Sequence, residues 1–279
     1  MKHVRIAGSA FKCLALAGLL IACNNDQVVA PTEPTSAAVG DQNAKLNPLT
    51  RLVDDSGQSI EYKKSGKFFG KISRVGKSPL NDEYVTYTYS ENPAGYLSIS
   101  KKTYKASNNS FIREHKFKVV NGQCTQSEND NGDIFEYKYN SEGYLSEVNQ
   151  FIQGILTESW KYKYDWTYRL NVIEHQKEGK PYHTYHFKSY TSIENKYPLN
   201  IEIGIRDRYL PIFGKCSKFQ VEEIMDYNLL TNNHVQTFYT KQKLNGDGLV
   251  IFRYMVKYAT VYKETFNYSV NWQGLPGNP

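Results

Sequence analysis

Residues 137–150, YKYNSEGYLSEVNQ, combine two alternating tyrosines, a turn and a short return stretch. A close copy stands at residues 87–99, YTYSENPAGYLSI, and a looser one at residues 162–173, YKYDWTYRLNVI. Side chains alternate across an extended strand, so Tyr137 and Tyr139 share one face while Glu136 and Lys138 share the other. The stretch therefore predicts a β-hairpin with an aromatic face and a polar face.

The same alternation recurs along most of the chain, which carries 23 tyrosines in 279 residues. Strands with one apolar face are typical of antiparallel sheets. Residues that tolerate positive φ separate them, at Pro93-Ala94-Gly95, Asn121-Gly122, Ser141-Glu142-Gly143 and Asn245-Gly246-Asp247-Gly248. We expect an all-β fold: an antiparallel meander of hairpins, either a curved sheet or barrel-like, with little helix outside a signal peptide.

The C-terminal part departs from the regular pattern. A loop-rich insertion after Lys196 is followed by a predicted strand with Phe219, Val221, Met225 and Tyr227 on one face. Residues 249–272 alternate again and are too long for one ordinary strand. We expect one face to hold the even-numbered side chains and a bend or hairpin to lie near residues 260–264; the even-numbered set is Tyr254, Val256, Tyr258, Tyr262, Phe266, Tyr268, Val270 and Trp272.

The first residues, MKHVRIAGSAFKCLALAGLLIACNND, have a basic start, a short apolar run and small residues. This pattern predicts a secretory signal peptide over residues 1–22, since the apolar run is about half the ~20 residues of a membrane-spanning helix. Its end, Leu20-Ile21-Ala22-Cys23, resembles the lipobox of bacterial lipoproteins. The resemblance implies cleavage after Ala22 and lipidation of Cys23; the alternative is an ordinary signal peptide with an incidental cysteine.

Residues 24–49 contain three prolines and no aromatic side chain, a composition typical of a disordered segment. We therefore expect a lipidated cysteine and tether at 23–49, and one β domain at 50–279 with a repeat part (50–190) and an irregular part (191–279). Lipid attachment would hold the protein on a membrane. We expect a bacterial cell-envelope location at the outer membrane, with the periplasmic and exterior faces both open.

The repeat resembles the YD repeats of Rhs-type surface proteins, whose pattern is Tyr-x-Tyr-Asp-x-x-Gly-Arg-Leu. The matching residues are Tyr137, Tyr139, Asn140, Gly143 and Leu145 in one copy and Tyr162, Tyr164, Asp165, Arg169 and Leu170 in the other. With the lipobox and the segment LPIFGKCSK, the chain also resembles an uncharacterised family of Bacteroides-type lipoproteins over roughly residues 50–272. That family has no assigned activity, so the resemblance implies a fold and a cellular location but no function.

The charge of the chain bears on nucleic-acid binding, and its cysteines bear on disulfide formation. The chain has 34 basic and 28 acidic side chains, and three basic ones fall in the predicted signal peptide. No basic block or basic helix is present, which argues against nucleic acid. Cys124 and Cys216 are the cysteines of the expected mature chain besides Cys23. They form either a disulfide, as extracytoplasmic cysteines often do, or two free, partly buried thiols.

No motif predicts catalysis, a cofactor or a metal. His183 and His186 would face opposite sides of a strand, and no phosphate loop, nucleophile elbow or zinc-type Cys/His cluster is present. We therefore expect no enzyme, no cofactor and no metal site, although catalytic groups that only the fold brings together stay open.

The aromatic face carries the candidate site. Its rings either form the core or present a partly exposed platform for a sugar or a partner protein; the candidates are Tyr137, Tyr139, Trp160, Tyr162 and Tyr164. Three functions follow, in order of preference. The first is a lipid-anchored, non-catalytic binding or structural module. The second is a glycan-binding component of an outer-membrane uptake system, and the third is an extracytoplasmic hydrolase.

Overall fold

The computed structural model of the chain describes residues 49–79 and 81–273. The predicted signal peptide, Cys23 and nearly all of the predicted tether lie outside these residues. Every regular element of the described part is a β-strand. The strands are β1 (Arg51–Asp55), β2 (Gln58–Tyr62), β3 (Ile72–Val75), β4 (Glu83–Glu91), β5 (Leu97–Lys105), β6 (Phe111–Val120), β7 (Gln123–Asn129), β8 (Ile134–Tyr139), β9 (Leu145–Ile152), β10 (Ile155–Tyr164), β11 (Leu170–Lys177), β12 (Lys180–Glu194), β13 (Phe219–Asn228), β14 (Asn233–Leu244), β15 (Val250–Lys257) and β16 (Thr260–Ser269).

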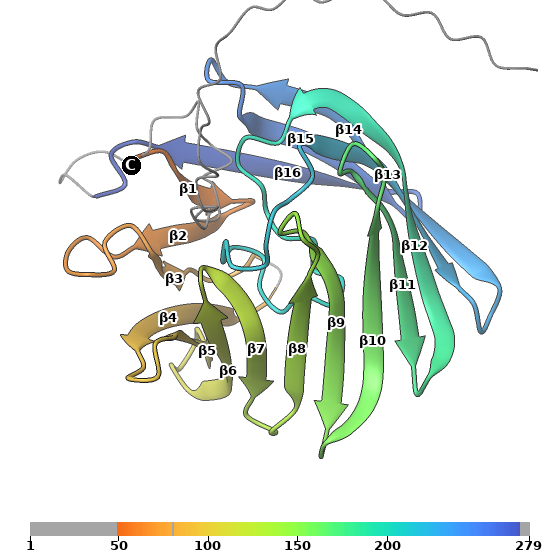
Figure 1. Ribbon diagram of the computed structural model, residues 1–279. Helices are drawn as coiled ribbons and strands as arrows, with labels where there is room; N and C mark the ends of the chain where they lie inside the picture. The colour runs from red at the N-terminus through yellow and green to blue at the C-terminus, as the bar shows by residue number, and fades with distance from the viewer. Residues whose placement is uncertain (1–48, 80, 274–279) are drawn as a thin grey trace, which may run out of the picture. The chain divides into compact units, whose positions relative to one another are not determined.

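These strands form one closed antiparallel barrel (Figure 1). Each strand pairs with its neighbour in sequence, and β1 pairs with β16 to close the ring, with Arg51 opposite Ser269. The expected all-β antiparallel meander is confirmed, in its barrel form. Closure leaves no unpaired sheet edge, which is where meanders are prone to aggregate.

The turns carry the residues that their backbone requires. Gly95, Gly143 and Gly248 have φ of 83°, 85° and 76°, and the two-residue turn Asn121-Gly122 has 50° and 79°. Glycine and asparagine tolerate this left-handed region, whereas most residues are strained there. The predicted hairpin turns are therefore confirmed.

The residue after the second tyrosine of a repeat closes the turn. The Asn140 side-chain oxygen accepts hydrogen bonds from the backbone N–H groups of Glu142 (3.1 Å) and Tyr144 (2.9 Å). Asp165 makes the equivalent bonds in the β10–β11 turn. Asn and Asp favour such side-chain-capped turns, so the Asn/Asp position of the repeat sets turn geometry.

The barrel is aromatic inside and polar over much of its outer face. Tyr87, Phe117, Phe135 and Tyr137 are buried, each stabilising the fold by about 1.5–3 kcal/mol relative to an exposed ring. Their strand neighbours face outward and form cross-strand ion pairs, such as the one between Lys138 and Glu147 at 3.1 Å. Over β14–β16 the outer face is apolar instead, with Phe238 opposite Val256 and Val256 opposite Val261, which is 60% exposed.

The C-terminal strands alternate differently from the sequence-based expectation. The hairpin turn lies at Tyr258-Ala259, where φ is 51° and 59°, slightly before the expected residues 260–264. Across this two-residue turn Val256 pairs with Val261, so even positions of β15 share a face with odd positions of β16. The predicted single even-numbered face is therefore wrong, and Phe266 lies inside the barrel while Val256 lies outside.

A similar shift affects β13. Irregular pairing between β12 and β13 near Ser189 and Tyr190 changes the register. As a result Val221 and Ile224 both line the barrel interior, and Met225, next to Ile224, faces the other side. The predicted shared face of Phe219, Val221, Met225 and Tyr227 is split by this irregularity.

Residues 195–218, between β12 and β13, form a plug inside the barrel (Figure 1). The plug makes hydrogen bonds to strands around most of the ring, which places it within the ring. Its partners include Asp55 on β1, Tyr62 on β2, Tyr87 on β4, Lys101 on β5, Cys124 on β7, Tyr139 on β8, Gln150 on β9, Tyr162 on β10 and Leu170 on β11. Within the described residues, no helix has the length and apolar character needed to cross a bilayer.

Candidate functional site

The second tyrosine of each repeat fastens its strand to the strand before it. Its hydroxyl donates a hydrogen bond to a backbone carbonyl of the preceding strand. The bonds are Tyr89 to Ile72 (2.9 Å), Tyr139 to Cys124 (2.8 Å) and Tyr164 to Leu145 (3.0 Å). The repeated tyrosines thus stitch the inner face of the barrel together.

Three of the five candidate aromatics pack beneath the plug. Tyr137 and Trp160 are almost fully buried, and the Tyr137 ring lies 5.2 Å from the ring of Phe213 in the plug. The Tyr139 hydroxyl also donates to the plug carbonyl of Ile212 at 3.2 Å. These three rings form the seat of the plug, whereas Tyr162 and Tyr164 line an internal cavity.

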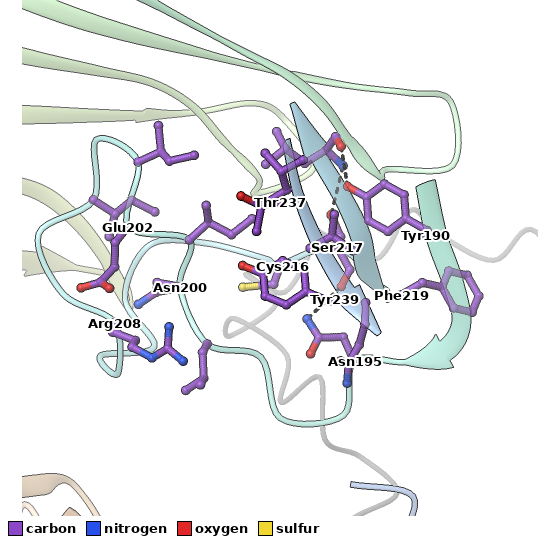
Figure 2. A pocket seen from close by; sticks show the side chains of 18 of the residues that line it. Tyr190, Asn195, Asn200, Glu202, Arg208, Cys216, Ser217, Phe219, Thr237 and Tyr239 are labelled. Atoms are coloured by element: carbon purple, nitrogen blue, oxygen red, sulfur yellow. Dashed lines mark hydrogen bonds between the residues drawn. The ribbon is translucent and has the colours of Figure 1, made fainter. Parts of the chain in front are cut away.

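That cavity, which we call the tyrosine cavity, has a volume of about 460 Å³ and lies between the plug and the inner face of β10–β16. Asn200, Glu202 and Arg208 of the plug line it together with Thr237 and Tyr239 of β14 (Figure 2). The volume falls in the ~300–1,000 Å³ range of small-molecule sites. Seven tyrosines of the described chain contribute to its wall: Tyr162, Tyr164, Tyr185, Tyr190, Tyr197, Tyr239 and Tyr268.

Three of these tyrosines have free hydroxyl groups. Tyr185, Tyr239 and Tyr268 make no side-chain hydrogen bond with any described residue. Burial raises the pKa of all three above the ordinary value of 10, so each hydroxyl stays protonated at neutral pH and can donate a hydrogen bond. The cavity therefore offers three unused donors on a wall that is mostly apolar and also carries polar and charged groups.

Two arginines at the cavity are neutralised by carboxylates. Arg208 Nε lies 2.8 Å from Asp55 Oδ2, and Arg253 Nε lies 2.5 Å from Glu264 Oε2. Burial disfavours the Arg208 charge, but Asp55 and Glu264 raise its pKa above the ordinary range. The four groups form a charge-balanced network that joins the plug to β1, β15 and β16.

Asp207 anchors the plug on the opposite side. Its side chain is fully buried and accepts hydrogen bonds from the backbone N–H groups of Tyr209 and Leu210, both at 2.8 Å. Lys101 Nζ lies 2.9 Å from Asp207 Oδ2. A buried carboxylate requires such compensation, because leaving water without a partner is costly for a charge.

Cys124 and Cys216 are free thiols. Cys124 is buried beside the plug, and Cys216 belongs to the plug and lines the tyrosine cavity. Burial raises the pKa of the Cys216 thiol to about 11 and that of Cys124 further. Both thiols are therefore protonated and weakly nucleophilic at neutral pH.

The structure brings one serine and one histidine together, as a hydrolase would require. His115 Nε2 lies 2.9 Å from Ser127 Oγ, which is also 2.8 Å from the Tyr137 hydroxyl. Ser127 is only 2% exposed, so a substrate cannot reach its oxygen. Burial, with Lys101 and Arg206, lowers the pKa of His115 to about 3, far from the value near 7 that suits a general base.

His183 and His186 lie on opposite faces of β12. His183 Nδ1 lies 2.7 Å from Asp226 Oδ1, while the His186 ring contacts Tyr227, with ring centroids 5.3 Å apart. Among residues 49–79 and 81–273, no group of three or more His, Cys, Asp or Glu side chains is placed to hold a metal ion.

Sequence reasoning missed the plug residues that shape the site. Asp207 and Arg208 sit in the run Arg206-Asp207-Arg208, flanked by apolar residues on both sides. Adjacent opposite charges within an apolar stretch are a usable signal, because such charges are buried only when paired. The sequence predicts only a loop-rich segment here, and nothing in its composition indicates that it turns into the barrel.

The chain matches no protein-family model and no curated protein. Among solved structures, a porin-like protein from Bacteroides uniformis is 18% identical, with a TM-score of 0.42 over 70% of this chain and 93% of its own. A porin-like protein from Bacteroides vulgatus is 10% identical, with a TM-score of 0.44 over 78% of this chain and 97% of its own. At these values the likeness supports no inference about the function of this chain.

Proposed function

We propose that the chain is a lipid-anchored, non-catalytic protein of the bacterial cell envelope that binds a small, largely apolar molecule in the tyrosine cavity. The observation that carries the proposal is the cavity itself. It combines a ligand-sized volume with a mostly apolar wall and three unused tyrosine hydroxyls. Apolar pockets with a few convergent polar groups are the usual form of a small-molecule site.

The free hydroxyls define the polar part of the ligand. Tyr185, Tyr239 and Tyr268 are neutral donors, and the nearby arginines are already paired with carboxylates. A ligand with an apolar body and uncharged acceptors, such as carbonyl or ether oxygens, satisfies these donors.

The absence of catalysis is part of the proposal. Ser127 is inaccessible and His115 is a weak base, so their contact suits a structural hydrogen bond. The glycan-binding alternative is less favoured at the five candidate aromatics, because Tyr137, Tyr139 and Trp160 are covered by the plug.

The envelope location is proposed from the lipobox-like sequence at Cys23, with attachment through lipid. The outer face of β8–β9, which bears the Lys138–Glu147 ion pair, suits water. Kinship with Bacteroides-type lipoproteins that carry YD-like hairpins is proposed from the tyrosine repeats and the segment LPIFGKCSK, and the side of the outer membrane is open.

The test uses the apolar fluorophore N-phenyl-1-naphthylamine with the purified mature chain. We expect saturable binding of one fluorophore per chain. Thr237→Trp, which places an indole in the cavity, should weaken binding at least tenfold. Gln236→Trp, on the exposed face of the same strand, is the matched control. Equal binding by the two variants, with both folded by thermal melting, would contradict the proposed site.

A further inference from the structure

A second cavity lies inside the barrel on the far side of the plug from the tyrosine cavity. It also has a volume of about 460 Å³ and is lined almost entirely by polar side chains of β5–β9 and the plug. The plug separates the two spaces, because Ile203 and Ile205 line the tyrosine cavity whereas Arg206 lines this one. We call it the polar cavity.

Arg206 lines the polar cavity, and its positive charge has no carboxylate partner among the described residues. Its guanidinium carbon lies 4.2 Å from the ring centroid of Phe135 and its Nη2 is 3.4 Å from Gln150 Oε1. Its Nε is buried without a hydrogen-bond partner, and no described carboxylate forms an ion pair with it. A guanidinium inside a protein is normally matched by a carboxylate or another oxyanion.

The other cations of the polar cavity already have partners. Lys101 is paired with Asp207 at 2.9 Å, and Arg113 is paired with Glu83 at 2.6 Å. His115 adds a neutral imidazole, since its pKa is lowered to about 3, mainly by burial. The plug side of the cavity therefore holds one positive charge in excess, on Arg206.

The opposite side of the cavity is rich in acceptors. The β7–β8 turn contributes Asp130, Asn131 and Asp133, and each aspartate has an oxygen outside the turn's own hydrogen bonds. Carboxylate and amide oxygens accept hydrogen bonds from hydroxyl groups. They would repel a second anionic group, so a ligand needs its negative charge at one end and neutral donors at the other.

We propose that the polar cavity binds a small hydroxylated carboxylic acid, with its carboxylate on Arg206 and its hydroxyl groups on the β7–β8 turn. This site is independent of the tyrosine cavity and takes a ligand of different chemistry. An arginine flanked by an amide donor suits a planar carboxylate, which accepts two parallel N–H bonds. A bound carboxylate would supply the oxyanion that the Arg206 guanidinium lacks.

The test is isothermal titration of the purified mature chain with D-glucuronate, D-glucose and acetate as separate probes. We expect glucuronate to bind one per chain, and glucose and acetate each to bind at least tenfold more weakly. No glucuronate binding at millimolar concentration would overturn the proposal. If glucose binds as tightly as glucuronate, the ligand's carboxylate plays no part in binding, which contradicts the proposal. If acetate binds as tightly as glucuronate, the ligand's hydroxyl groups play no part, which also contradicts it.

Two variants connect the binding to the site. Arg206→Met keeps an unbranched chain over Phe135 but loses the charge, and should weaken glucuronate binding at least tenfold, while Arg206→Lys should keep part of it. Gln150→Leu, which leaves the plug sequence intact, should weaken binding about threefold. Unchanged affinity in Arg206→Met would overturn the proposal. A cooperative thermal melt shows that each variant is folded; if Arg206→Met does not fold, the Gln150→Leu result decides.

Discussion

The Tyr87 hydroxyl donates a 2.7 Å hydrogen bond to the carboxylate of Asp207, and both side chains are almost completely buried. The bond joins β4 to the plug across 120 positions of sequence. It works together with Lys101, which supplies the charge opposite to Asp207. The plug is therefore held by a buried, charged contact on one side of the barrel and by the Arg208 network on the other.

Replacing Asp207 should destabilise the barrel strongly. Asp207→Ala leaves Lys101 and the Tyr87 hydroxyl without their acceptor, and breaking a buried pair in this way costs about 3–5 kcal/mol. The free energy of unfolding in urea measures the effect. Asp247→Ala, in the exposed β14–β15 turn, is the control and should change stability by less than about 0.5 kcal/mol. Similar losses in both variants would contradict the anchoring role.

A side chain at Gly204 should be poorly tolerated. Gly204 has φ of 76°, and a Cβ there would lie 2.8 Å from Trp160 Cγ. Gly154 has φ of 78°, but a Cβ there would meet nothing within 4 Å, so Gly154→Ala isolates the cost of the left-handed backbone, about 1–2 kcal/mol. Gly204→Ala should cost about 1–3 kcal/mol more through overpacking. Equal melting temperatures would show that the plug can move away.

His115 should make the barrel sensitive to mild acid. Its native pKa is about 3, below the ~6.5 of an unfolded histidine, so protons bind preferentially to the unfolded chain as the pH falls below 6.5. Stability is retained above that value and lost below it. Between pH 7 and pH 5 the natural chain should lose about 2 kcal/mol more than His115→Gln.

Urea titrations at the two pH values measure this difference. His234→Gln, at the exposed start of β14, removes a histidine without touching the interior and serves as the matched control. A reduction in acid sensitivity of the same size in the control, or none in His115→Gln, would contradict the assignment.

The two interior thiols should react slowly. The Cys216 pKa of about 11 lies two units above the ordinary 9, so its thiolate fraction at pH 8 is lower by about 100-fold. Iodoacetamide labelling followed by peptide mass spectrometry should be slow in the folded chain and fast in urea. A peptide pair linked through Cys124 and Cys216 would instead reveal a disulfide.

Lipid attachment should depend on Cys23. In cells that express the full chain, radioactive palmitate should label the natural protein, and Cys23→Ala should lose the label. Cys13→Ala, within the predicted signal peptide, is the control and should keep it. Unchanged labelling of Cys23→Ala would rule out the anchor.

The strands of this fold could be predicted because strand and turn formation depends mainly on residues that are close together in the sequence. Alternating side chains around Tyr137 and the turn at Gly143 depend on neighbouring residues, and the structure confirms both. The predictions failed where register depends on distant partners. The parity change at Tyr258-Ala259 follows from turn length, and the split face of β13 follows from its pairing with β12.

The candidate site was less predictable than the fold. Tyr162 and Tyr164 line the tyrosine cavity, but Tyr239 and Arg208 were not anticipated. Their proximity requires the plug to enter the barrel, and that placement is set by contacts over long sequence distances, such as Arg208 with Asp55. No local pattern encodes such contacts.

The position of the plug also bears on how the barrel assembles. The ring closes between β1 and β16, the first and last strands, so closure must wait for the whole chain. The plug follows β4–β11 in the chain and forms hydrogen bonds to strands of that range, such as those with Tyr87 on β4 and Leu170 on β11. Both of its ends join neighbouring strands, so it enters the barrel without a knot. A plug seated on these strands before closure would cover their aromatic face and so protect the chain from aggregation during a slow, long-range closure.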